Sequence, residues 1–574
     1  MEESVTKETL RFPKIICPES ASSGITLSRI IGRVCDRLPM ASLALLLLLL
    51  SSCSPATDPD RTGLRFEITF PAAVSEEALS GRMFLAIADT DDPEPRLQVG
   101  RYGVPVFGVD FEELGPDTPV VIDADTLGWP IMRLDDFPPG DYYVQAVLNK
   151  YTRFERADGH TVWMHMDQWE GQNWRRSPGN VISAVQRLRI DPATAETHRI
   201  EVTDIIPPIE LPEDTRWVKR IKMQSDTLTE FWGQPIYFGA TMLLPRGYDE
   251  NPDASYPTVY QQGHFSLRAP FGFDGANEFS RAWMSDDFPR FIAVTIQHPT
   301  PYFDDSYAVN SANNGPYGDA IHQELIPEIE RRFRTIPESW ARVLTGGSTG
   351  GWESFALQVF YPDFYGGTWS FAPDPLDFRN VEGINVYEDT NAFYKQHEWY
   401  RVPTANTRFA PTGEVRLTSR QRNTMELVNG TKGRSGQQLD IWSAVFGPLG
   451  DDGYFKPLFD KETGEVDAAV AEYWRDNYDL RHILETNWEE IGPQLVGKLH
   501  VIAGDMDNFY LNVGAYHMQE FLESSEDPYY EGSFTFGARG GHGWRPYSST
   551  ELLRIMADHI RGNAPPGADT SGWQ

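Results

Sequence analysis

Apolar and polar residues alternate in short runs through the first third of the chain. The run at 64–70 alternates throughout, which is the pattern of a strand with one buried face. Similar short runs, separated by turns rich in Pro, Gly and Asp, recur at 83–88, 119–122, 142–148 and 199–202. We find no convincing amphipathic helix before residue 205. This pattern predicts an all-β domain over residues 64–204, of the immunoglobulin-like sandwich type.

From residue 218 onward, short apolar runs alternate with stretches of helical periodicity. The apolar runs lie at 218–223, 235–244, 258–260, 291–296, 368–371 and 499–503. Apolar residues spaced by four predict a helix over 319–333, in which Pro327 predicts a kink or a later start. The alternation predicts a largely parallel α/β sheet over residues 218–562. A proline-rich linker is expected at 205–217, and a disordered tail at 563–574.

The length, net charge and cysteine content of the chain exclude some classes of structure and function. A chain of 574 residues is too long for one core, and 40% hydrophobic content is a globular value. The net charge of -33 argues against nucleic acid as a partner, because phosphate binding needs a basic surface. The cysteines are Cys17, Cys35 and Cys53, so the chain beyond Cys53 can form neither a disulfide nor a thiolate metal site.

The N-terminal segment has the order of a secretory signal. Basic residues precede an apolar run at 43–50, which is too short to cross a bilayer and is followed by two serines and Cys53. This ending resembles a bacterial lipobox, so we expect 1–53 to be a lipoprotein signal, on an extended start, with Cys53 lipidated. Ser54 resembles an address on the periplasmic side of the outer membrane, and 54–63 resembles a flexible tether.

A glycine-rich turn supplies a candidate nucleophile. Gly346, Ser348 and Gly350 spell G-x-S-x-G between a short apolar run and a helical stretch at 352–360. This is the pattern of the nucleophile elbow of α/β-hydrolases, in which a sharp strand-to-helix turn exposes the serine. Glycine at the flanking positions avoids a collision within so tight a turn.

Two later loops supply a candidate acid and base. Asp507 follows the predicted strand at 499–503, and His542 stands between glycines after an apolar run at 534–536. The order Ser, Asp, His is that of an α/β-hydrolase triad, in which the acid orients the base that takes the serine proton. Asp505 is the alternative acid, because it lies in the same loop.

The oxyanion of the reaction needs two preorganised N–H donors. The backbone of Thr349, directly after the nucleophile, is the first candidate. The loop after the strand at 258–260 supplies the second, from Phe265 or His264.

The longest irregular stretch of the β region, at 156–180, is rich in His, Asp and Trp. Three interpretations stay open for it: tryptophan packing across a domain interface, a wall of the substrate cleft, or a metal site.

Several pieces of the second half occur together in a known family. They are Tyr256-Pro257, Gly318-Asp319-Ala320-Ile321, the stretch 324–330, Tyr361-Pro362-Asp363-Phe364, and the loops of Ser348, Asp507 and His542. Residues 218–562 thereby resemble the bacterial putative-esterase family, which includes enterochelin esterases, S-formylglutathione hydrolases, feruloyl and acetyl-xylan esterases and mycolyltransferases. The resemblance implies an α/β-hydrolase fold and a Ser-His-Asp carboxylic-ester hydrolase without metal or cofactor.

The chain departs from the family in two places. Members usually have His-Gly where this chain has Gly263-His264, which leaves the second oxyanion donor open. The stretch 377–496 is also long for the family and is expected to form a cap over the site.

We therefore expect a serine carboxylic-ester hydrolase that acts through an acyl-enzyme on an ester-substituted glycan, an aryl ester or a siderophore-type ester. One alternative is a serine peptidase or amidase with the same triad. The other is a non-catalytic surface binding lipoprotein on a hydrolase scaffold. Membrane contact is expected only through a lipid anchor at Cys53.

Overall fold

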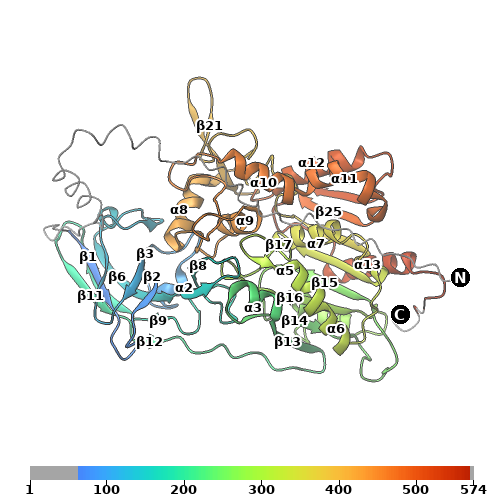
Figure 1. Ribbon diagram of the computed structural model, residues 1–574, viewed down its shortest axis with the longest axis horizontal. Helices are drawn as coiled ribbons and strands as arrows, with labels where there is room; N and C mark the ends of the chain where they lie inside the picture. Colours follow the sequence, from blue (N-terminus) through green and yellow to red (C-terminus); the bar gives the residue numbers. More distant parts are fainter. Residues whose placement is uncertain (1–62, 569, 571–574) are drawn as a thin grey trace, which may run out of the picture. The chain divides into compact units, whose positions relative to one another are not determined.

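The computed structural model of the protein describes residues 63–568 and residue 570, which lie in one compact unit. The predicted signal, Cys53 and the tether fall outside these residues, apart from Gly63. Within the described ranges, no helix combines the length and the apolar character that a membrane span requires. Figure 1 draws the chain from blue at the N-terminal strands to red at the last helix.

Two larger sheets and the two-stranded sheet of β7 (Thr152–Glu155) and β8 (Thr161–Met164) make up the N-terminal region among the described residues. A three-stranded sheet has the order β11-β1-β4, and a larger sheet has the order β12-β9-β6-β2-β3-β5 with β10 paired to β6. The bounds are β1 Arg65–Thr69, β2 Leu79–Ala88, β3 Val106–Leu114, β4 Val120–Ile122, β5 Gly128–Trp129, β6 Gly140–Lys150, β9 Val181–Ile182, β10 Gln186–Ile190, β11 Thr197–Glu201 and β12 Asp204–Ile205. The short helix α2 (Pro95–Gln98) precedes β3.

Strand β2 is buried on both faces, which explains its long apolar run. Met83, Leu85 and Ile87 join a core with β1 and β6. Phe84 and Ala86, on the opposite face, pack with Val428 of α8 (Ser419–Asn429). The N-terminal strands are therefore anchored to a helix that lies more than three hundred residues later in the sequence.

The second half contains an eight-stranded sheet of order β13-β14-β16-β15-β19-β20-β25-β26. Strand β14 runs antiparallel to both neighbours, and the strands from β16 to β26 are parallel. The bounds are β13 Val218–Ser225, β14 Ile236–Leu243, β15 Thr258–Gln262, β16 Ile292–Gln297, β19 Arg342–Gly347, β20 Gly367–Phe371, β25 Leu499–Gly504 and β26 Ser533–Gly537. Every predicted strand of this region is confirmed to within a few residues, and the arrangement is an α/β-hydrolase sheet.

Helices cover this sheet. They are α3 Asp226–Trp232, α4 Glu278–Trp283, α5 Tyr317–Ala320, α6 Ile326–Arg332, α7 Thr349–Phe360, α12 Leu511–Glu523 and α13 Ser549–Asn563. The helix predicted over 319–333 is interrupted by a π-helical turn at Ile321–Leu325, after which Pro327 stands in the first turn of α6. Pro327 thus stands at a later helix start, which is one of the two effects predicted for it.

The segment between β20 and β25 contains its own elements. They are the hairpins β21–β22 (Tyr394–Gln396, Arg401–Pro403) and β23–β24 (Ala405–Arg408, Val415–Thr418), with α8, α9 Gln438–Phe446, α10 Ala468–Tyr478 and α11 Leu480–Leu495. Residues 206–217 form neither helix nor strand, as the prolines there predict.

Candidate active site

Ser348 stands at the turn between β19 and α7. Its φ of 60° and ψ of -123° are strained for a residue with a side chain. A Cβ on Gly346 would lie 2.1 Å from the carbonyl oxygen of Gly350, and one on Gly350 would lie 2.2 Å from that of Gln262. Glycine is therefore required at both positions, and the turn holds the Ser348 side chain at the carboxyl end of the central strands.

Asp507 and His542 meet at the same end of the sheet. Asp507 follows β25 and is fully buried, and its Oδ2 lies 2.7 Å from Nδ1 of His542, which follows β26. Its other oxygen accepts hydrogen bonds from the backbone N–H groups of Phe509 (2.8 Å) and Leu511 (3.3 Å). The structure thus brings Asp507, rather than Asp505, against His542.

Opposing influences set the pKa of His542. Burial lowers it, but the hydrogen bond and charge of Asp507, together with the charges of Asp374 and Glu382, outweigh burial and raise the pKa above its usual value. A base with a raised pKa attracts the serine proton more strongly, provided that the imidazole is neutral before the reaction.

Asn508 and Arg408 hold the acid–base loop in place. The backbone N–H of His542 donates to Oδ1 of Asn508 (2.9 Å), and Asn508 Nδ2 donates to the carbonyl of Arg408 (3.0 Å). Arg408 in turn donates to the carbonyl of Asp507 (2.8 Å) and to Asn512 Oδ1 (3.1 Å). Sequence reasoning missed both residues, and Arg408 carries no local motif that could have revealed it.

The Ser348 hydroxyl donates to a second carboxyl group, Oδ1 of Asp374, at 3.4 Å. Asp374 follows β20 at the same rim and is buried. Its Oδ2 accepts from the hydroxyls of Tyr307 (2.6 Å) and Thr349 (3.0 Å) and from Gln438 Nε2 (3.1 Å). Burial raises the pKa of Asp374, although the hydrogen bonds from Tyr307 and Thr349 act against it.

Ser348 and His542 share no hydrogen bond in the described part of the chain. His542 nevertheless lies close enough to Asp374 for its charge to lower the pKa of that carboxyl group. Because Asp374 contacts Ser348, the hydroxyl and the imidazole both border the space around this carboxyl group. An acid that follows the predicted strand at 368–371 was the sequence signal that could have identified Asp374.

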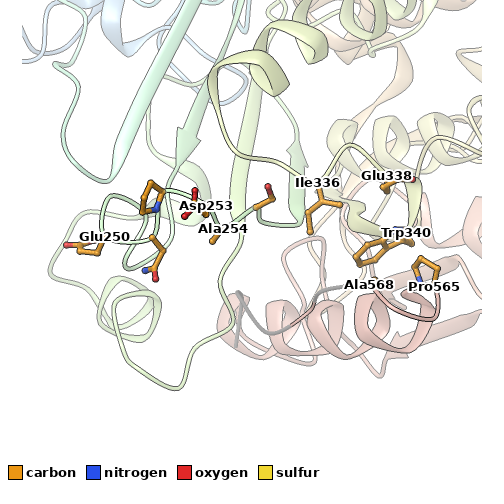
Figure 2. A pocket seen from close by; sticks show the side chains of 11 residues that line it. Glu250, Asp253, Ala254, Ile336, Glu338, Trp340, Pro565 and Ala568 are labelled. Atoms are coloured by element: carbon orange, nitrogen blue, oxygen red, sulfur yellow. The ribbon is translucent and has the colours of Figure 1, made fainter.

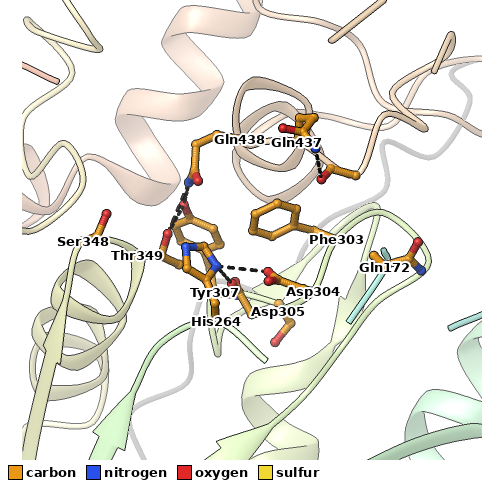
Figure 3. A network of polar contacts seen from close by, with 12 residues as sticks. Gln172, His264, Phe303, Asp304, Asp305, Tyr307, Ser348, Thr349, Gln437 and Gln438 are labelled. Carbon is orange, nitrogen blue, oxygen red and sulfur yellow. Dashed lines mark hydrogen bonds and ion pairs between the residues drawn. The ribbon is translucent and has the colours of Figure 1, made fainter. Parts of the chain in front are cut away.

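The loop after β15 adjoins the elbow, since a Cβ on Gly350 would also lie 2.7 Å from the backbone nitrogen of Gly263. Figure 3 shows the His264 ring turned toward Asp304 and Asp305, with Nδ1 3.0 Å from an oxygen of each. Burial lowers the pKa of His264, but the two aspartates raise it well above its usual value. Phe265 instead packs edge-on against Trp169, at 5.2 Å between ring centres.

His264, Asp304 and Asp305 are the group, among the described residues, whose ligand atoms lie close enough together to hold a metal ion, within 4.8 Å of one another. Both contacts are made by Nδ1, and the charges and hydrogen bonds of the two aspartates account for the raised pKa of His264. The arrangement fits a charged histidine clamped by two carboxylates.

The stretch 156–180 packs against other parts of the chain. Trp174 stacks on Phe84 with 3.9 Å between ring centres and donates to Asn429 Oδ1 of α8 at 3.0 Å. His165 lies 2.7 Å from Glu170 and 3.0 Å from the Ser177 hydroxyl. These contacts favour the packing interpretation of the stretch over the metal interpretation.

A cavity of about 820 Å³ lies elsewhere (Figure 2). It is lined by Glu250, Asp253 and Ala254 before β15 and by Ile336, Glu338 and Trp340 before β19. These residues precede the strands that Gln262 and Gly347 end, so the cavity borders the amino ends of the strands and not the rim of Ser348.

Comparison with known proteins finds a family that matches part of the second half of the chain. The profile of the family described as putative esterase matches residues 238–442. These residues are therefore similar to the putative esterase family. The match includes the elbow and the loop of His264, and it ends before Asp507 and His542. The protein is accordingly an esterase.

Solved structures of three esterases and hydrolases show similarity to the chain. A ferulic acid esterase is 14% identical, with 60% of this chain and 99% of that chain covered and a TM-score of 0.36. A fluorophosphonate-binding serine hydrolase of Staphylococcus aureus, FphF, is 14% identical, with 60% and 98% covered and a TM-score of 0.33. An S-formylglutathione hydrolase from Agrobacterium tumefaciens is 12% identical, with 61% and 97% covered and a TM-score of 0.33. No curated protein matches the sequence.

Proposed function

We propose that this esterase is a serine carboxylic-ester hydrolase with Ser348 as nucleophile, His542 as base and Asp507 as the acid that orients it. The observation that carries the proposal is the 2.7 Å contact between His542 Nδ1 and Asp507 Oδ2 at the rim that also holds the strained Ser348. An imidazole whose Nδ1 is bound to a buried carboxylate presents Nε2 for proton transfer.

The reaction follows from these positions. His542 Nε2 takes the Ser348 proton as Oγ attacks the ester carbonyl, and the resulting oxyanion is stabilised by N–H donors. We assign one donor to the backbone of Thr349 and the other to the backbone of Phe265 or His264. His542 then gives its proton to the leaving alcohol, which leaves an acyl-serine. Water, deprotonated by His542, attacks the acyl-serine and releases the acid.

Asp374 bears on the resting state of this site. The Ser348 hydroxyl donates its hydrogen bond to this carboxyl group. Rotation about the Cα–Cβ bond of Ser348 exchanges this partner for the imidazole, and catalytic hydrogen bonds commonly tighten only when substrate binds. Substrate in the site is proposed to trigger the exchange.

The substrate is proposed to be an ester-substituted glycan, an aryl ester or a siderophore-type ester, on the strength of the sequence resemblance. For the region of residues 64–204, we propose an immunoglobulin-like sandwich, which two sheets around a shared apolar core support. We further propose a lipid anchor at Cys53 and a place on the periplasmic side of the outer membrane, on the sequence evidence alone.

Hydrolysis of 4-nitrophenyl acetate by the purified protein tests the proposal, with Ser348→Ala as the control. We expect release of 4-nitrophenol by the wild type and a loss of at least 10³-fold in kcat for Ser348→Ala, because residual catalysis would come only from binding and oxyanion donors. Full activity in the alanine variant would contradict the assignment. Faster cleavage of peptide anilides than of esters would favour the peptidase alternative.

A further inference from the structure

The loop between α2 and β3 of the N-terminal region reaches the candidate active site. A turn bond from the Gly103 N–H to the Gly100 carbonyl (3.1 Å) closes this loop. Trp129 Nε1 donates to the Arg101 carbonyl at 3.2 Å, and the Tyr102 hydroxyl lies 3.4 Å from Oγ1 of Thr407. The loop is therefore held by contacts on both sides.

The Arg101 side chain ends beside the acid–base pair. Its guanidinium carbon lies 4.9 Å from the ring centre of Phe509. Phe509 packs edge-on against the His542 ring, with 4.9 Å between centres and an interplanar angle of 82°. One aromatic ring thus separates the guanidinium from the catalytic imidazole.

Arg101 is a half-buried cation without a fixed anion. In the described part of the chain, its guanidinium forms neither a hydrogen bond nor an ion pair, and burial lowers its pKa to about 10. The buried Arg82 is a contrast, because it donates to the carbonyls of Val428 and Gly108 and pairs with Asp110 at 2.8 Å. A desolvated guanidinium with unused N–H donors favours an anion that the protein itself does not supply.

Glu382 and Glu426 lie near enough to attract Arg101, but each is engaged elsewhere. Glu426 pairs with Arg422 at 3.2 Å and accepts the backbone N–H groups of Leu439 and Asp440. Glu382 accepts a hydrogen bond from Asn406, and burial raises its pKa to about 7. Its backbone φ of 46° is strained, as is common for residues at functional sites.

The side of the site that Arg101 borders indicates which part of the substrate it meets. His542 returns its proton to the leaving alcohol, so the alcohol part of an ester lies on the His542 side of the serine. A guanidinium fork matches the two oxygens of a carboxylate.

We propose that Arg101, on the N-terminal loop, forms a subsite for a carboxylate on the alcohol part of the ester. This inference rests on the proposed esterase function and specifies its substrate class. The N-terminal region then contributes directly to substrate selection.

The first test compares two acetate esters on the full chain: 4-acetoxybenzoate, which carries the carboxylate, and methyl 4-acetoxybenzoate, which does not. We expect Arg101→Gln to lower the ratio of their kcat/KM values, charged over neutral, by about tenfold or more, the effect of one charge-assisted pair. Arg101→Lys should retain part of the ratio, because it keeps the charge and loses the fork. Arg133→Gln, at an exposed arginine of the same region, should leave the ratio at the wild-type value.

The second test does not need turnover. In the Ser348→Ala background, calorimetry measures the binding of 4-hydroxybenzoate, the product of the charged ester. We expect Arg101→Gln to weaken this binding about tenfold and to change the binding of methyl 4-hydroxybenzoate much less.

Two outcomes would overturn the inference. One is hydrolysis of both esters with an unchanged ratio in Arg101→Gln, which would leave the esterase function intact. The other is equal binding of 4-hydroxybenzoate with and without Arg101. Absence of wild-type turnover on every ester would instead contradict the proposed function, and thermal unfolding midpoints of the variants identify loss of folding.

Discussion

At the scale of single residues, His542 is the group whose environment controls the reaction. Burial lowers its pKa, whereas Asp507, Asp374 and Glu382 raise it further than burial lowers it. The base must be neutral to accept the Ser348 proton, so kcat/KM should fall as pH falls through this raised pKa and level off above it.

Glu382→Gln tests this balance. Removal of a nearby negative charge disfavours the imidazolium, so the pKa of His542 should fall and the acid limb of the pH–kcat/KM profile should move to lower pH. Glu462→Gln, at an exposed turn, is the control and should leave the profile in place. A shift of the limb to higher pH would contradict the electrostatic account.

The two acids of the loop after β25 offer a matched comparison. Asp507→Asn should lower kcat by about 10³ to 10⁴, because the amide cannot hold the imidazole in the tautomer that presents Nε2 as a base. Asp505→Asn should change kcat far less, since His542 contacts Asp507. Steady-state kinetics on 4-nitrophenyl acetate measures both. The reverse order of effects would reassign the acid to Asp505.

At the scale of elements, the buried side chain of Arg82 links β2 to α8 in addition to their apolar contacts. Arg82 of β2 donates to the carbonyl of Val428, which lies in α8, and pairs with Asp110 of β3. These contacts connect the N-terminal sheet to the segment between β20 and β25. The loop of Arg101 precedes β3, so its position relative to Phe509 depends on this connection.

Arg82→Met should destabilise the chain by about 3 to 5 kcal/mol, because it leaves buried carbonyls and part of the charge of Asp110 without a partner. Its thermal midpoint should fall by several degrees. Arg187→Met removes an exposed pair with Asp141, at 3.8 Å, and should change the midpoint little. Equal midpoints for the two variants would show that the Arg82 contacts contribute little.

At the scale of the whole molecule, the parallel sheet explains why part of the candidate site could be predicted from the sequence. Strands β19, β20 and β25 were recognisable from apolar runs, and the carboxyl ends of parallel strands share one rim. Chain order alone therefore pointed to Ser348, Asp507 and His542. Their catalytic roles stay predictions, as do the domain boundaries and the oxyanion donors.

Contacts between distant loops were outside the reach of sequence patterns. Arg408 supports the Asp507 loop from a hairpin about a hundred residues earlier, and Arg101 approaches Phe509 from still further away. Such pairs depend on packing of the complete chain, because neither residue has a periodicity or motif of its own. Asp374 was within reach, since it follows a predicted strand at the same rim.

Covalent labelling tests the central claim most directly. After treatment with diisopropyl fluorophosphate, peptide mass spectrometry should find one phosphoryl adduct, on Ser348. The adduct should be absent in Ser348→Ala and should form far more slowly in His542→Ala, because the base is missing. An adduct on another residue, or equally fast labelling without His542, would contradict the account.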